Sequence, residues 1–375
     1  VAPQLITLGT WRTVWQMTCK YIKNDKLRRV FSCQPLLVGG NPFNTTSIYS
    51  LIQYLEREWG VHYAMGGTGA IVEGLRKLME EEGVKIRLGQ EIDRIEIDFV
   101  KTIVRPVYER VDSVRLRGAE VIELFETDDE DNPLWNGIVV CNADPPHVYK
   151  NLLDKQHRHG WAPRHVDSLK YSMGLFVLYF GTMREYPDVA HHTIILGDKY
   201  ESLLHEMFDK HELEMSDFSV YLHRPTATDP SMAPPGCDCW YVLVPVPNLQ
   251  GGQDWKTLGP KYRDLVVEYL EQKAIPGLKQ CIVEDFYVTP EHFRDNLNTL
   301  HGTGFSIQPT FRQSAYFRFH NKSEDIEGLY FVGQGTHPGA GIPGVLCSAK
   351  VLEHLIPAVG NHKSQVATHK EAPKG

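Results

Sequence analysis

The sequence predicts a fold that combines an α/β region with an α+β region, and three observations lead to this. Residues 328–356 read as a buried strand, a glycine-rich loop and a helix. Residues 147–325 contain many short apolar strands and few helices. Residues 1–60 carry apolar side chains at helical spacing. At 375 residues the chain can bury a large core, which predicts more than one domain.

The composition is that of a globular protein, with 42% hydrophobic and 23% charged residues. A net charge of −8 argues against nucleic acid as a partner. The seven cysteines are an odd number scattered along the chain, which favours a reducing, cytoplasmic compartment. No apolar run approaches the length of a membrane-spanning helix, and the N-terminus has no secretory signal pattern. Cys237 and Cys239 lack further ligands at metal spacing, so no metal site is predicted.

The first sixty residues are predicted to be helical, with helices over Leu5–Trp15 and Ile48–Leu55. Thr45 or Thr46 can cap the second helix, and Gly60 can end it. Two interpretations stay open, a helical subdomain packed on itself or a helical lip that dips into a bilayer surface. The second rests on an aromatic and basic mixture, namely Trp11, Trp15, Lys20, Tyr21 and Lys23.

A further helix is predicted to begin at Gly66–Gly69 and to end at Gly83. These glycines match neither the dinucleotide fingerprint nor the Walker pattern, so helix capping is the preferred interpretation. Val84, Ile86 and Leu88 alternate as a strand, which we expect to continue through Ile92–Ile97 after a bend.

The next stretch, residues 98–137, is less regular. Asp128–Asp131 predicts a solvated loop between two strands rather than a calcium site, because the EF-hand spacing is missing. Gly137–Pro146 then predicts a strand that ends in a turn.

A mixed or antiparallel sheet is predicted between residues 147 and 325. Its aromatic-rich strands could form the floor of a large apolar pocket, or they could form an ordinary hydrophobic core. Two helices are expected within it, near Glu201–Phe208 and over Pro260–Lys273. The expected strands are Leu175–Phe180, Thr193–Leu196, Phe218–Leu222, Trp240–Val244 and Cys281–Val288.

The C-terminal run carries the most specific chemistry. After the strand Leu329–Val332, glycines at 333, 335, 339, 341 and 344 allow a backbone to approach a ligand closely. Pro343 fits the first turn of the helix that follows. Unpaired N–H groups and the positive end of the helix dipole meet at this point, which suits a phosphate or the N1/O2 edge of a reduced flavin. A tight connection in an α/β fold is the alternative.

Thr336–Gly344 resembles the C-terminal flavin-binding signature of the bacterial and fungal type of phytoene desaturase, within the FAD amine-oxidase-like flavoproteins. The resemblance covers nearly the whole chain in order. It includes Ser32–Phe43, Leu55–Gly60, Gly66–Ala70, Ser172–Gly181, Ala190–Thr193, Tyr221–Pro225, Tyr241–Pro247, Pro276–Leu278, Phe293–Leu297 and His301–Gly302.

This resemblance implies a partial Rossmann-like FAD-binding domain, a mixed-sheet substrate domain and a helical membrane-facing subdomain. The family begins with a GxGxxG βαβ unit that this sequence does not contain, so we expect a truncated chain that retains part of an FAD site. Residues 98–137 look like an insertion of unknown role. The implied domains are 1–65 (helical), 66–146 (return segment of the FAD domain), 147–325 (substrate domain), 326–360 (C-terminal FAD segment) and 361–375 (disordered tail).

By resemblance, the cofactor is FAD and the activity is desaturation of phytoene or a related polyene, with hydride transfer to flavin N5. Gly341, Ile342, Pro343, Gly344 and Val345 would lie against the isoalloxazine ring. Gly333 and Gln334 would lie near the ribityl–pyrophosphate, and the backbone of Ile92 would meet the adenine.

The implied partners are a polyene substrate, a membrane surface on the cytoplasmic side, a quinone or oxygen as electron acceptor, and a second copy of the chain. No catalytic acid or base is predicted. His337 could titrate usefully, but a loop-fixing hydrogen-bond donor is the preferred role. The alternatives to a desaturase are a carotene cis–trans isomerase of the same superfamily and a non-catalytic polyene-binding fragment.

Overall fold

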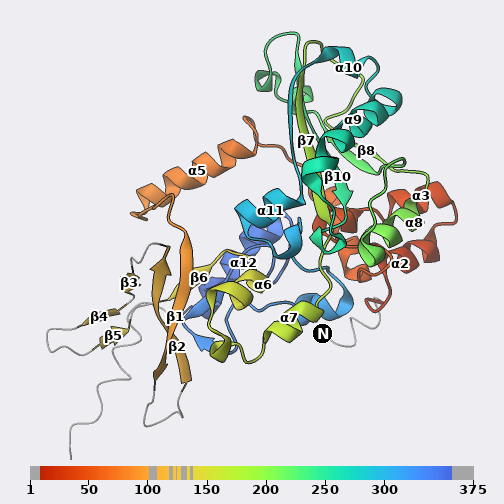
Figure 1. Cartoon of the computed structure of the whole chain (residues 1–375). Coiled ribbons are helices and arrows are strands. Elements are labelled where there is room, and N and C mark those ends of the chain that lie inside the picture. Colours follow the sequence, from red (N-terminus) through yellow and green to blue (C-terminus); the bar gives the residue numbers. More distant parts are fainter. Residues whose placement is uncertain are drawn as a thin grey trace, which may run out of the picture. The chain divides into compact units, whose positions relative to one another are not determined.

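The computed structural model describes residues 9–100, 108–117, 121–123, 125–127, 133–135 and 138–356 (Figure 1). The chain divides into two compact units, each built from two separate segments. Unit 1 comprises residues 1–88 and 170–313, and unit 2 comprises 89–169 and 314–375. The finer division into five parts stays a prediction.

Unit 1 begins with a helical segment. Thr13 caps its first helix, because the Thr13 hydroxyl accepts from the Gln16 N–H and the Gln16 side chain accepts from the Thr13 N–H. Of the predicted helix over Leu5–Trp15, only Val14 and Trp15 are helical in the described part; the prediction is wrong for residues 9–13, since Trp11 lies in a turn before this cap. The helices here are α2 (Val14–Tyr21), α3 (Asp25–Val30), α4 (Leu51–Trp59) and α5 (Thr68–Glu81), with 3₁₀ turns at Gln34–Val38 and Ser47–Ser50.

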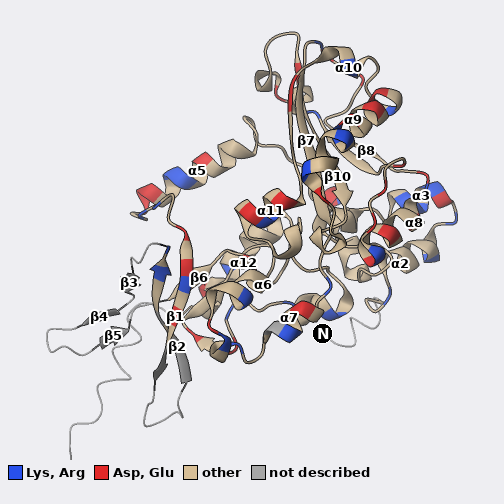
Figure 2. Ribbon diagram, in the orientation of Figure 1, with Lys and Arg blue, Asp and Glu red and all other residues tan. Residues whose placement is uncertain are grey.

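The termini of α4 and α5 confirm the glycine assignments. Gly60 ends α4 with a φ of 75°, and Gly67 caps α5. No residue of α5 is buried. Residues of both charges alternate along α5 (Figure 2). The Arg76 guanidinium forms ion pairs with Glu73 at 2.7 Å and with Glu80 at 2.5 Å.

The predicted strand over Val84, Ile86 and Leu88 is wrong. This segment lies outside the regular strands, and all three side chains are exposed. Alternation alone does not make a strand, because a strand also needs a neighbour to complete its hydrogen bonds. The continuation is confirmed, since Ile92–Val100 forms β1.

A five-stranded antiparallel sheet, in the order β11-β7-β10-β9-β8, forms the centre of unit 1 and confirms all five predicted strands. The strands are β7 (Gly174–Thr182), β8 (His192–Ile195), β9 (Val220–His223), β10 (Asp238–Val246) and β11 (Ile282–Val288). The helices beside them are α8 (Tyr200–His205) with a π-helical turn (Glu206–Lys210), α9 (Trp255–Lys273), α10 (Leu278–Cys281) and α11 (Pro290–Leu297).

One face of this sheet is a closed core against α9. Every second residue of β10 points into it and is buried, including Trp240, Val242 and Val244. The helix α9 begins five residues before its predicted start and runs through Pro260. It does so because Asp254 caps it and because Trp255, in its first turn, is buried in the core.

Unit 2 contains two small sheets. In the first, β1 pairs with β2 (Tyr108–Leu116), which pairs with β3 (Val121–Glu123) and with β12 (Ile326–Glu327). The second joins β6 (Val139–Cys141) in parallel to β13 (Leu329–Phe331). Strands β4 (Phe125–Thr127) and β5 (Pro133–Trp135) form a separate pair. Part of the predicted insertion thus forms strands, while Asp128–Asp131 and the tail 361–375 lie outside the described residues.

The helical elements of unit 2 surround an aromatic core. Tyr149 stacks on Phe331 with ring centres 5.5 Å apart, and Trp161 packs on Phe319 at 4.0 Å. This packing holds β13 in place, and the predicted C-terminal helix follows as α12. The helices are α6 (Pro145–His147), a π-helical turn (Val148–Leu152), α7 (Pro163–Ser168) and α12 (Ile342–Leu355).

Candidate functional site

Where the glycine loop leaves β13, its backbone passes very close to the side chain of Asn142. Gly333 has a φ of 103°, and a Cβ there would lie 2.6 Å from Asn142 Oδ1. Only glycine fits both conditions without strain. The Gly333 N–H donates to Ser348 Oγ at 2.8 Å, so this N–H is already used inside the protein. Gly333 therefore shapes the loop, and α12 supports it through Ser348.

A buried arginine from a preceding segment holds the loop backbone. Arg318 is 2% exposed, and its guanidinium donates to the carbonyl of Thr336 at 3.1 Å and to that of Gln334 at 2.6 Å. The Thr336 hydroxyl donates back to the carbonyl of Phe319 at 2.6 Å, and the His337 N–H donates to the same carbonyl at 3.1 Å. These hydrogen bonds help to fix residues 334–337, and the two from Arg318 have a charged donor.

His337 is half-buried within this arrangement. Its carbonyl accepts from the Asn321 side chain at 2.8 Å. Its ring Nδ1 is buried and has no hydrogen-bond partner among the described residues. Burial lowers the pKa of the ring, and the charges of Arg318 and His320 lower it further. The backbone of His337 therefore fixes the loop, whereas the loop-fixing role predicted for its side chain stays a prediction.

The start of α12 offers an open backbone edge. Gly341 has a φ of 98°, no side chain caps the helix, and a Cβ at Gly341 would meet no atom within 4 Å. By helix geometry the N–H groups of Ile342 and Gly344 precede the first intrahelical bond, which runs from the Val345 N–H to the Gly341 carbonyl at 2.9 Å. This edge favours an anionic group.

Apolar surface flanks that edge, since Ile342 and Leu346 are both more than half exposed. A Cβ at Gly344 would lie 2.8 Å from the Gly339 carbonyl, so the first turn packs directly on the loop. An apolar surface beside an anion-favouring helix start fits a flat heteroaromatic ring with a negatively charged edge. The predicted residues Gly341, Ile342, Pro343, Gly344 and Val345 all lie in this one turn.

Ile92 lies in the other sheet of unit 2. It is the first residue of β1 and pairs with Leu116 of β2. That sheet connects to the loop through β12, which pairs with β2 and continues through Gly328 into β13. The structure thus brings Gly333, Gln334 and the first turn of α12 together, whereas Ile92 belongs to a different sheet.

A hollow of about 520 Å³ opens beside the loop at His337. Its walls come from the segment that follows Arg312 and from the end of α12. It is lined by Ala315, Tyr316, His320, Asn321, Lys322, Ser323, Glu324, His337 and Leu355.

The second face of the five-stranded sheet in unit 1 carries a row of aromatic rings. Tyr179 lies 4.7 Å from Phe286 and 5.8 Å from Tyr241, and Tyr221 lies 5.6 Å from Tyr241, all between ring centres. Phe286 is 60% exposed, and the three tyrosines are half-buried. Burial raises the pKa of all three tyrosines. The aromatic strands thus build a plain core on one face and a partly open apolar surface on the other.

Two features of the molecule were not predicted from the sequence. Arg318 gave no sequence signal, because a single arginine between loop residues has no diagnostic spacing. The histidines at 191, 192 and 223 lie close together in space. Their signal would have been the pair His191–His192 at the start of one strand and His223 at the end of the next, but it requires the strand register.

No family model matches the chain. Among curated proteins, a lycopene-forming phytoene desaturase of Pseudescherichia vulneris is 44% identical over 94% of this chain and 68% of its own length. A lycopene-forming enzyme of Pantoea ananas is 42% identical over 95% of this chain and 68% of its length. A neurosporene-forming enzyme of Cereibacter sphaeroides is 43% identical over 95% of this chain and 65% of its length. The chain spans about two thirds of the length of these relatives.

Solved structures show the same fold at low identity. An oxidoreductase of Methanosarcina mazei has a TM-score of 0.58 at 15% identity, over 94% of this chain and 71% of its own. A putrescine oxidase has a TM-score of 0.52 at 10% identity, over 93% of this chain and 69% of its own. The mixed α/β fold of this chain is therefore that of known oxidoreductases.

Proposed function

Because this chain belongs to the phytoene desaturase family, we propose that it is an FAD-dependent oxidoreductase that acts on the CH–CH groups of phytoene or a related carotenoid precursor. The observation that carries this proposal is the 44% identity to a lycopene-forming enzyme over 94% of the chain. The glycine loop and the first turn of α12 lie within the stretch that matches this relative. Desaturation in carotenoid biosynthesis is the reaction that the family name describes.

When bound, FAD supplies a hydride acceptor at N5. The first turn of α12 would hold the ring, with its free N–H groups and dipole facing the edge that gains negative charge. Ile342 and Val345 would provide apolar contact. Gln334 would lie near the ribityl–pyrophosphate, and Gly333 would shape the loop there without donating its N–H. Arg318 holds the loop backbone in place through its hydrogen bonds to the carbonyls of Gln334 and Thr336.

The substrate is a hydrocarbon without polar groups, so its binding depends on buried apolar area at roughly 25 cal/mol per Å². In unit 1, the aromatic face formed by Tyr179, Tyr241 and Phe286 offers apolar surface of this kind. Desaturation also needs a group that accepts a proton, and we assign no residue to that step.

The N-terminal helical segment is proposed to bind a membrane surface. Trp11 is 62% exposed, with the Arg12 guanidinium 4.2 Å from its ring centre, and Tyr21 is 71% exposed, with Lys20 at 5.0 Å. Aromatic rings beside basic groups are typical of bilayer interfaces. In the described part of the chain, no helix is long and apolar enough to span a bilayer. A membrane quinone or oxygen would then reoxidise the flavin.

Flotation with anionic liposomes tests the membrane proposal. The unchanged protein should float with the vesicles, and the double variant Trp11→Ser/Tyr21→Ser should stay in the soluble fraction. The matched control is Tyr316→Ser, an exposed tyrosine of unit 2. Equal flotation of all three proteins would rule out this surface.

The catalytic proposal is tested with phytoene in liposomes, added FAD, and either a quinone or oxygen. The expected products are lighter than phytoene by a pair of hydrogens per step, and they absorb at longer wavelength. A product of unchanged mass would indicate an isomerase instead. Retention of phytoene without conversion would indicate a polyene-binding protein.

Gly344→Ala is the diagnostic variant for the flavin site, because its Cβ would lie 2.8 Å from the Gly339 carbonyl. We expect it to lose bound flavin. The control Gly74→Ala lies within α5, where a Cβ meets no atom within 4 Å, and should retain the flavin content of the unchanged protein. Equal flavin content in both variants would contradict the assignment of α12.

A further inference from the structure

Three histidines gather at the edge of the five-stranded sheet in unit 1. The register of β8 and β9 places His192 directly opposite His223, and His191 precedes β8. One ring nitrogen of each of the three lies within 4.8 Å of the other two. Residues directly opposite in an antiparallel pair share a face of the sheet, so His192 and His223 point to the same side.

Hydroxyl groups orient all three rings. The Tyr221 hydroxyl lies 2.6 Å from His192 Nδ1 and 3.1 Å from His223 Nδ1, so it bridges them. The Thr228 hydroxyl lies 2.5 Å from His191 Nδ1. Metal-binding histidines are commonly fixed in this way, with one ring nitrogen held by a neighbour and the other left for the ion.

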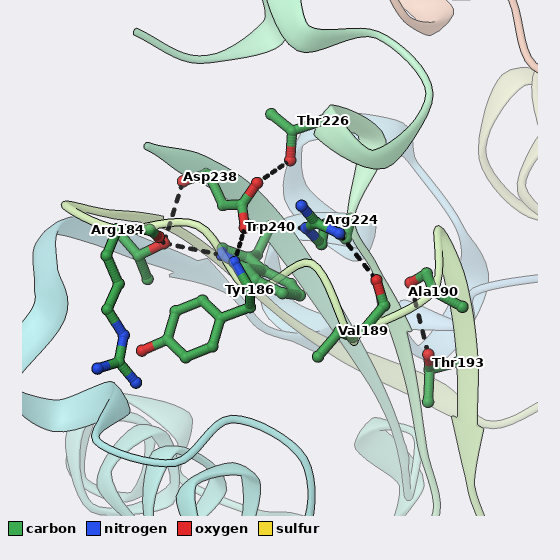
Figure 3. Close-up of polar contacts among 10 residues, drawn as sticks. Arg184, Tyr186, Val189, Ala190, Thr193, Arg224, Thr226, Asp238 and Trp240 are labelled. Carbon is green, nitrogen blue, oxygen red and sulfur yellow. Dashed lines mark hydrogen bonds and ion pairs between the residues drawn. The ribbon is translucent and has the colours of Figure 1, made fainter. Parts of the chain in front are cut away.

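A buried polar network fixes the backbone on either side of the cluster (Figure 3). Arg224, next to His223, forms an ion pair with Asp238 at 2.9 Å. The Arg224 backbone N–H donates to the His191 carbonyl at 2.8 Å. The Arg224 guanidinium donates to the Val189 carbonyl at 2.9 Å (Figure 3). Asp238 also accepts from the Tyr186 N–H at 2.7 Å. The network therefore ties the start of β8 to the end of β9.

One ring nitrogen of the cluster, His191 Nε2, is buried and has no hydrogen-bond partner among the described residues. A buried polar atom without a partner is costly, and a bound ion is one way to satisfy it.

Ring packing alone is the competing explanation. His191 lies 4.7 Å from the Tyr63 ring, and His223 stacks on Tyr241 at 4.6 Å. Such contacts stabilise imidazoles without an ion. The three imidazoles also pack on one another, with ring centres 4.2–5.3 Å apart. However, these contacts leave His191 Nε2 without a hydrogen-bond partner among the described residues.

We propose that His191, His192 and His223 bind one divalent transition-metal ion of the zinc class, with the fourth position taken by water. An all-imidazole set suits zinc, copper or nickel, whereas calcium and magnesium prefer oxygen ligands. Zinc–nitrogen bonds of about 2.0–2.1 Å place tetrahedral nitrogens about 3.3 Å apart, so small side-chain rotations must close the cluster. The ion would join the turn before β8 to the end of β9.

The site uses none of the residues of the glycine loop, but His223 stacks on Tyr241 of the aromatic face proposed for the substrate. The test therefore measures metal binding and not the reaction. The test uses the purified chain without a histidine tag. After incubation with Zn²⁺ and dialysis, elemental analysis should find one ion per chain. Co²⁺ should give the visible absorption of a tetrahedral site, and Zn²⁺ should raise the melting temperature.

His223→Gln and His192→Gln should each weaken Zn²⁺ binding about tenfold or more and abolish the cobalt spectrum. The control is His205→Gln, an exposed histidine of α8 that pairs with Asp209 at 2.7 Å, and it should bind as the unchanged protein does. Near-ultraviolet circular dichroism checks that each variant is folded, and exposed His192 provides a ligand variant if His223→Gln fails to fold. The proposal is overturned if the unchanged protein retains no zinc, or if a folded His192→Gln variant retains as much zinc as the control.

Discussion

Arg318→Met offers the sharpest test of how the glycine loop is built. Methionine keeps most of the apolar stem of the side chain but removes the guanidinium. The substitution therefore deletes the hydrogen bonds to the carbonyls of Gln334 and Thr336. Both carbonyls lie in a region where Arg318 itself is only 2% exposed, so water replaces the lost donor poorly.

The expected magnitude follows from these two bonds. Hydrogen bonds to a charged group contribute about 1.5–3 kcal/mol each. Removing a buried charge relieves part of its desolvation cost. We therefore expect the free energy of local opening of residues 331–341 to fall by about 2–4 kcal/mol, and amide protection there to fall roughly 30- to 700-fold.

Hydrogen exchange with mass spectrometry measures this directly, on peptides that cover 331–341 and, as an internal reference, β10. The control is Arg312→Met, an exposed arginine a short distance upstream, which should change protection by less than about 0.5 kcal/mol. Unchanged protection of 331–341 in a folded Arg318→Met protein would refute the view that Arg318 fixes the loop. Flavin content should fall in parallel with protection.

Three further predictions concern ionisable side chains. Burial alone would raise the pKa of Glu214, but hydrogen bonds from a neighbouring serine, a lysine and the backbone lower it to about 2. Because the folded pKa lies below the unfolded one, Glu214→Gln should cost about 2–3 kcal/mol above about pH 4.5, and thermal melts should show this difference vanish toward pH 2. Burial raises the pKa of Cys33 to about 11, so iodoacetamide at about pH 8 should spare Cys33 and label exposed Cys347; equal labelling would contradict this. Asp238→Asn leaves Arg224 buried without its ion-pair partner and should cost about 3–5 kcal/mol in urea unfolding, whereas a loss below about 1 kcal/mol would show that the pair is not essential.

The local sequence pattern predicted those elements whose packing requires buried side chains at a regular spacing along the chain. The alternation in Trp240–Val244 predicted β10 because every second side chain must enter the core, and the structure confirms that arrangement. Leu329–Val332 and the following glycines predicted the end of β13 and the start of α12, because Gly333 occupies a backbone conformation that other residues rarely adopt. The agreement of ordered motifs along the chain indicated the family.

Pattern failed where the outcome depended on a distant partner. Val84, Ile86 and Leu88 alternate like a strand, but no strand among the described residues pairs with them. The start of α9 depended on the docking of Trp255 into a core formed by β7 and β10. A short stretch of sequence shows neither whether a strand has a partner nor where a side chain such as Trp255 is buried.

The sequence by itself determined the family, the five strands of the central sheet and the glycine loop with its helix, because short-range backbone preference and side-chain period encode them. Only the tertiary structure decided what surrounds them. Arg318 lies outside the glycine loop in the sequence and contacts it only in the folded chain. His192 and His223 are far apart in the sequence, and only the register of β8 and β9 places them opposite each other. Contacts between residues far apart in sequence are chosen by which surfaces can be buried together, and that choice is made only when the whole chain packs.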